Sequence, residues 1–272
     1  MTAVTTAHRA TDSGLLKGLT RVGFIGYGLL HLALAWVAAQ IALGESGQEA
    51  DQSGAFRTLA AQPFGKPLLW FVIACLVALA VWQAILAVWG HRDVRGKERI
   101  AERVFSGARV IVYLVLAWSA GKVVTGAPQS SAEQQQQVTA GILAKPAGQW
   151  LVALIGVGVL AFGVGMMWYG LKREFEKKLS IGGELPYKAR RAVIRAGQIG
   201  YTSKGVAFGI VGLLLVRAAA TNDPAKSRGL DAALHTIADQ PFGKFLLLAV
   251  ALGVAAFGVY CFFQARYRKV GT

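Results

Sequence analysis

The sequence predicts an all-α membrane protein with six transmembrane helices, arranged as three parallel two-helix repeats. Three observations predict this class: six long apolar segments, short motifs that recur from one pair of segments to the next, and basic residues that gather in alternate loops. Hydrophobic residues make up 54% of the chain and charged ones 16%, and there are 33 glycines. This composition is far from that of an ordinary soluble domain and places the chain in a bilayer.

Each apolar segment is close to the roughly 20 residues that a helix needs to cross about 30 Å of hydrocarbon. A polar tail without an apolar core and cleavage motif precedes the first segment, so we expect an uncleaved anchor and no removable signal peptide. The six expected spans are residues 22–43, 67–90, 104–125, 149–171, 197–219 and 242–265.

Motifs at matching positions carry the internal repeat. RVGFIGY, which begins at Arg21, recurs as RAGQIGY from Arg195, with Arg, Gly, Ile, Gly and Tyr at the same spacing. QPFGK at 62–66 recurs at 240–244, and the second unit has the related KPAGQ at 145–149. A self-similar period of this kind indicates one structural unit present three times.

These motifs divide the chain into a tail and three units. Because each unit has two spans, it enters and leaves on the same side of the membrane, so the repeats are parallel and not inverted. Three such hairpins can close around a pseudo-threefold axis. The expected parts are a cytoplasmic tail at 1–18, unit one at 19–93, unit two at 102–179 and unit three at 193–270.

The loop inside each unit has an apolar pattern of its own. Phe56 and Leu59, like Leu234 and Ile237, lie three residues apart, ahead of a proline that stops a helix. We expect a short amphipathic helix in the membrane interface, with a capped surface loop as the alternative. The glutamine run at 134–137 in the second unit predicts a polar loop.

The basic residues predict the orientation. Nineteen Lys and Arg residues lie on the side of both termini, and six lie in the three opposite loops. Basic loops stay cytoplasmic, so we expect both termini inside a bacterial cytoplasmic membrane. The basic segment 172–195 also favours anionic lipid as a partner. Nucleic acid is excluded, because no basic folded module with stacking aromatics is present.

The repeated residues resemble a known family. The Arg, Gly and Tyr of the first helix, the Lys204-Gly205 pair and the Pro-x-Gly element before the second helix are similar to the bacterial membrane family called domain of unknown function 1206. The resemblance covers about residues 19–270, and unit two departs from it, with Arg109 where the other units have tyrosine. It implies a membrane location and repeats, and it transfers no catalytic residues.

Aligning the units places polar residues of the first helices in register. Tyr27, Arg109 and Tyr201 form one layer, and a second layer four residues later lies on the same helix face. If this face lines the axis, an anionic ligand or lipid headgroup can complete a cationic and phenolic cluster, since no expected span contains Asp or Glu. The alternative is structural hydrogen bonding between helices. The candidate ligand or lipid contacts are Tyr27, His31, Arg109, Tyr113, Tyr201 and Lys204.

No other chemistry stands out. The four histidines are scattered without an HExxH or CxxC pattern, so neither a metal nor a cofactor is expected. Cys75 and Cys261 fit buried hydrophobic positions, and the acids of the outer loops have no convergent partner in the sequence. We therefore expect a non-enzymatic envelope component that packs with lipid or another membrane protein, in an oligomeric state that the sequence leaves open. The alternative is a transporter or channel for a small anionic or polar solute.

Overall fold

The computed structural model is all-helical and describes residues 14–44, 49, 51–91, 96–127, 130–180 and 186–269. Residues 1–13 of the expected tail lie outside this part. Six helices are long and apolar enough to cross a membrane, which confirms the expected class and the six spans. They are α2 (Gly14–Ala42), α4 (Gly65–Trp89), α5 (Lys97–Val124), α7 (Gly148–Leu171), α8 (Tyr187–Thr221) and α10 (Gly243–Tyr267).

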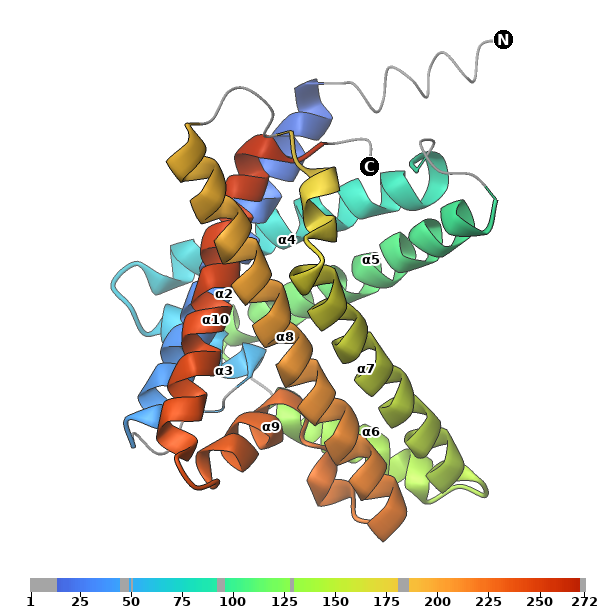
Figure 1. The fold of residues 1–272 in the computed structure, drawn as a ribbon. Coiled ribbons are helices and arrows are strands. Elements are labelled where there is room, and N and C mark those ends of the chain that lie inside the picture. Colours follow the sequence, from blue (N-terminus) through green and yellow to red (C-terminus); the bar gives the residue numbers. More distant parts are fainter. Residues whose placement is uncertain are drawn as a thin grey trace.

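A short helix joins the two long helices of each unit: α3 (Gln52–Ala60), α6 (Ser131–Leu143) and α9 (Gly229–Ala238). All three lie away from the side on which α2 begins and α10 ends (Figure 1). We call these the loop side and the terminal side. The expected short helices in units one and three are confirmed. The prediction of a polar loop at 134–137 is wrong, because these residues belong to α6. The hydroxyl of Ser130 accepts a hydrogen bond from the Glu133 N–H at 3.1 Å, and this N-cap starts α6.

The apolar faces of α3 and α9 point into the protein and not into the bilayer surface. Phe56 is fully buried, and Leu234 is 2% exposed. The reason is that α3 packs across α2, α4 and α5, while α9 packs against α8 and α10. These helices therefore close the loop side of the bundle, and their apolar residues pack against the protein where the sequence predicted contact with the membrane interface.

The Pro-x-Gly elements form the same reversal in every unit. Phe64, Ala147 and Phe242 have φ angles of 63°, 60° and 61°, in the left-handed region. The following residue must be glycine for reasons of space, because a Cβ on Gly65 would collide with the carbonyl oxygen of Leu59. The repeated motif thus fixes how each long second helix starts from the preceding short one.

The long helices follow a cyclic order. The second helix of each unit packs along the first helix of the next, so that α4 meets α5, α7 meets α8 and α10 meets α2. Within units one and three, α2 also packs on α4 and α8 on α10. The order of neighbours is therefore pseudo-threefold, and the long helices pack more extensively between units than within a unit.

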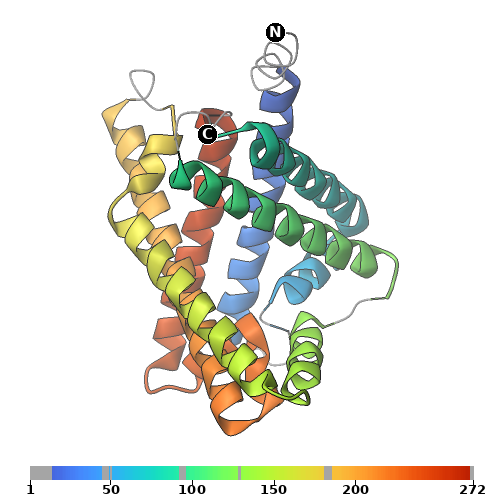
Figure 2. The ribbon, with the colours of Figure 1, turned by 90° about the vertical axis from the view of Figure 1, so that its right-hand side faces the viewer.

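Unit two departs from this symmetry. In the part of the chain that the structure describes, α5 and α7 do not pack along one another as the long helices of units one and three do, and α6 packs against α7 on the loop side (Figure 2). The buried share of the apolar stretch falls from 61% in α2 to 22% in α5 and 17% in α7. Much of the apolar surface of unit two is thus uncovered by the rest of the protein.

Glycines let α7 and α8 approach closely, as expected for small residues between membrane helices. A Cβ on Gly163 would lie 2.6 Å from the Gly209 nitrogen and 2.7 Å from the Gly205 oxygen. Gly158 and Gly165, on the same helix, face open space. Gly163 therefore allows close packing of α7 on α8, and Gly158 and Gly165 take no part in it.

Candidate functional site

Lys204 of α8 lies at the centre of the predicted cluster. Its Nζ donates to the Tyr27 hydroxyl at 3.2 Å and lies 3.1 Å from Nε2 of His31. The same nitrogen is 4.0 Å from the centroid of the Phe257 ring, a cation–π distance. An ammonium group has three N–H donors, and two acceptors and one π face are available to them. Neutral groups of the protein therefore surround this cation.

The tautomer of His31 follows from its two partners. Its Nδ1 lies 2.8 Å from the backbone oxygen of Tyr27, which can only accept a hydrogen bond. Nδ1 must therefore carry the proton, which leaves the lone pair of Nε2 to accept from Lys204. We assign a neutral His31 that is 6% exposed and joins α2 to α8.

Aromatic rings extend the cluster across the bundle. The Tyr113 ring of α5 lies 5.4 Å from that of Tyr27, and the Tyr201 ring lies 5.2 Å from Phe257. The structure thus brings the predicted residues of α2, α5 and α8 together. Phe257 of α10, which is 4% exposed, was not among them, because the uniformly apolar α10 gives no signal that singles it out.

Arg109 is half-buried and lies within electrostatic range of Tyr27 and Tyr113. Glu102, two turns earlier on α5, is also within that range. Helix α5 begins at Lys97, seven residues before the expected span, and so includes this carboxylate. The expected span contains no carboxylate, but the helix is longer than that span and includes Glu102, whose ion-pair partner is Lys178.

The basic segment after α7 folds back onto the bundle. It forms a short 3-10 helix, Glu174–Lys178, whose Phe175 ring stacks 5.5 Å from Tyr201. Lys178 contacts Glu102 at 3.0 Å, while burial and the nearby Arg268 charge lower the pKa of Lys178 below its ordinary value. This part of segment 172–195 is structural, and its Lys178 faces the protein.

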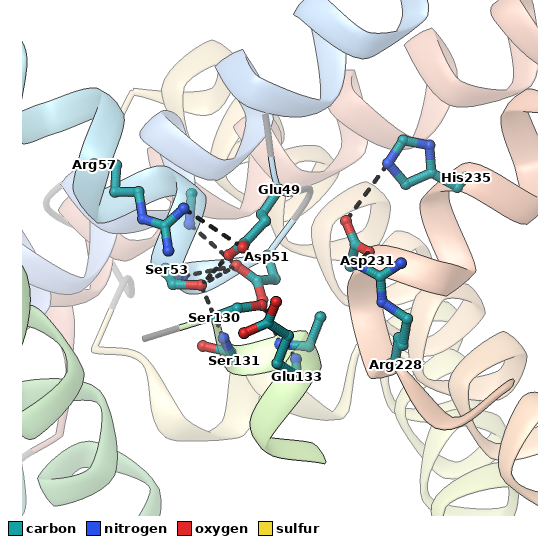
Figure 3. A network of polar contacts seen from close by, with 12 residues as sticks. Glu49, Asp51, Ser53, Arg57, Ser130, Ser131, Glu133, Arg228, Asp231 and His235 are labelled. Atoms are coloured by element: carbon teal, nitrogen blue, oxygen red, sulfur yellow. Dashed lines mark hydrogen bonds and ion pairs between the residues drawn. The ribbon is translucent and has the colours of Figure 1, made fainter. Parts of the chain in front are cut away.

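A second polar cluster lies on the loop side (Figure 3). Asp51 is 1% exposed, and its Oδ1 accepts from the backbone N–H groups of Ser53 at 2.9 Å and Gly54 at 3.1 Å. Its Oδ2 accepts from the N–H of Ala132, the second residue of α6, at 3.1 Å. Burial raises the pKa of Asp51 above its ordinary value, although the Ser53 hydrogen bond opposes this effect. One carboxylate therefore caps α3 and holds α6.

Two further acids of this cluster have partners. Glu49 lies 3.4 Å from Arg57, and Asp231 lies 3.2 Å from Arg228 and 3.5 Å from His235. The expectation that the outer acids have no convergent partner is thus wrong. All these contacts cap or join short helices, and an aspartate before a helix is the signal that could have found Asp51.

Among the described residues, no group of three or more His, Cys, Asp and Glu side chains is arranged to hold a metal ion. Cys75 and Cys261 are buried free thiols, which confirms the reading of both as buried residues. Cys75 packs against Gly26, where α2 and α4 approach one another.

The repeated geometry agrees with comparisons to known proteins. The family model described as Domain of Unknown Function (DUF1206) matches this chain three times, at residues 22–90, 106–173 and 199–268. The chain belongs to this family. It is 31% identical to the uncharacterized protein YxxB of Bacillus subtilis over 263 residues, which are 94% of this chain and 92% of that protein. No solved structure matches.

Proposed function

We propose that this multi-pass membrane protein is a non-enzymatic component of the bacterial cytoplasmic membrane, with both termini in the cytoplasm. It acts by packing with lipid or another membrane protein through unit two. The observation that carries this proposal is the low burial of α5 and α7, 22% and 17%, beside 61% in α2. A unit that its own neighbours cover so little is suited to association within the membrane.

The central cluster supports a non-transport role. A site for a mobile anion would present the Lys204 ammonium to a ligand. Here Tyr27, His31 and the face of Phe257 surround it, and all three belong to helices that pack at the centre. Such contacts between helices stabilise a membrane bundle by an average of about 0.6 kcal/mol each. Their effect is to hold units one and three in register.

Photo-crosslinking in native membranes tests this proposal. A photoreactive residue at Leu154 of α7, which is 69% exposed, is expected to give one adduct of defined mass. The matched control is Leu252 of α10, which is 71% exposed and also lies on a second helix. It is expected to give only scattered lipid adducts. Equal adduct patterns at the two positions would contradict a special role for unit two.

One observation favours transport of a small anion as a second candidate. Lys204 and Arg109 place two cations among the central tyrosines, and none of the three groups around Lys204 is anionic. Chloride and phosphate efflux from proteoliposomes decides between the two functions. We expect wild type to match both empty vesicles and Lys204→Met. Efflux that disappears in Lys204→Met would establish the carrier function instead.

A further inference from the structure

A cleft of about 420 Å³ opens between α5, α6, α7 and α8 on the loop side. Its volume is in the range of about 300–1,000 Å³ typical of small-molecule sites. Most of its lining residues belong to α5, α6 and α7 of unit two, and Figure 2 shows where these three helices lie. None of the six predicted site residues lines it, so it is separate from the central cluster.

The lining of the cleft changes from apolar to polar along its length. Val115 and Leu116 of α5 and Ile155 of α7 form apolar walls. Lys122 lies nearly two turns closer to the loop-side end of α5, and Gln134 of α6 lies opposite this end. Lys122 is the single charged residue of the described lining, and its Nζ is 5.7 Å from the Trp118 ring. Tryptophan and lysine together are typical of the headgroup level of a membrane.

We propose that this cleft binds one phospholipid, with an acyl chain between α5 and α7 and its phosphate at Lys122. The inference deepens the proposed function, on which it rests, by naming the lipid and its site. The apolar walls match the chain, and the ammonium and amide donors match the phosphate and ester oxygens. A partner helix, about 10 Å wide with its side chains, would need a groove along the whole span, whereas the cleft is lined only by the loop-side halves of α5 and α7.

Native mass spectrometry of the delipidated full chain, titrated with phosphatidylglycerol, tests the acyl-chain site. We expect one tightly bound lipid on wild type. Ile155→Trp fills the cleft and should lose this lipid, whereas Leu154→Trp changes the neighbouring residue, which does not line the cleft, and should retain it. Both variants must elute and melt as wild type does. Equal lipid binding by the two variants would overturn the proposal.

The phosphate contact has its own test. Lys122→Gln should weaken phosphatidylglycerol binding about fivefold, the equivalent of ~1 kcal/mol for one cation near the headgroups. Lys66→Gln, at an exposed loop-side lysine of unit one, should leave binding unchanged. Equal binding by all three proteins would overturn the placement of the phosphate.

Other outcomes separate this inference from the function on which it rests. If wild type binds no lipid but forms a dimer that Ile155→Trp abolishes, a second copy occupies the cleft and the lipid inference is wrong. If Ile155→Trp removes the lipid while crosslinks at Leu154 and Leu252 remain alike, the lipid site stands and the proposed role of unit two does not.

Discussion

At the residue scale, Asp51 is the side chain that joins the short helices of units one and two. Its carboxylate takes hydrogen bonds from the start of α3 and from the start of α6, although it is 1% exposed. A buried carboxylate is tolerated only when hydrogen bonds replace its hydration. Burial still dominates and raises its pKa, and the nearby Glu49 and Asp231 charges act in the same direction.

This shift predicts a pH dependence of stability. A carboxyl group with a raised pKa in the folded state binds more protons there than in the unfolded state, so its contribution to stability falls as the pH rises. From about pH 4 upward, Asp51→Asn should therefore become steadily more stable relative to wild type, until the folded-state pKa is passed. Thermal unfolding in detergent measures this difference. The exposed Asp239→Asn is the control, and parallel pH profiles for wild type and Asp51→Asn would contradict the prediction.

The repeat register could place five of the predicted residues near one another, because Tyr27, Arg109 and Tyr201 occupy one position on the first helices, and His31 and Tyr113 lie four residues later. The sequence could not indicate Phe257. Only its contacts with Lys204 and Tyr201 in the folded protein distinguish it from the other apolar residues of α10. Nor could it indicate Glu102, since hydropathy begins the span at residue 104, seven residues after the helix itself begins.

At the scale of elements, the pair α7 and α8 shows that glycine content alone does not define an interface. Gly163 and Gly165 are two residues apart on α7, but only Gly163 meets the backbone of α8. Side chains two apart do not share a helix face. Hydropathy located α7 correctly along the chain. Because it averages over all faces of a helix, it gave no indication of which face α7 would bury.

The two glycines make a matched pair of variants. Gly163→Ala should lower stability by about 1–3 kcal/mol, the usual effect of overpacking a close contact. Gly165→Ala gains the same helix propensity of about 1 kcal/mol without a clash and should be neutral or stabilising. Unfolding in mixed detergent micelles compares them. Equal effects of the two changes would show that α7 and α8 do not pack through Gly163.

Helix α6 was missed for a different reason. Its glutamine run has no apolar periodicity, and the residues that start the helix, Ser130 and Glu133, lie outside the run itself. Serine followed by glutamate three residues later is a capping pattern that outweighs a polar composition. The short helices α3 and α9 were predictable because they carry apolar pairs and a following proline.

At the scale of the whole molecule, the chain crosses between the two sides six times, with α3, α6 and α9 on one side only (Figure 1). Alkaline phosphatase is active only when exported, and basic residues resist export. Fusions after Gln52, Gln135 or Asn222 should therefore be active, and fusions after Lys97 or Lys178 should be inactive. The reverse activity pattern would invert the proposed orientation.

The cyclic order of helices has a consequence for synthesis. Gly28 of α2 and Gly258 of α10 meet at the contact that closes the cycle, although 230 residues separate them. At a translation rate of ~5–20 residues per second, α2 waits about 10–50 s for this partner. Until α8 and then α10 have been made, Tyr27 and His31 lack their contacts with Lys204 and Phe257, so the polar face of α2 is completed only at the end of synthesis.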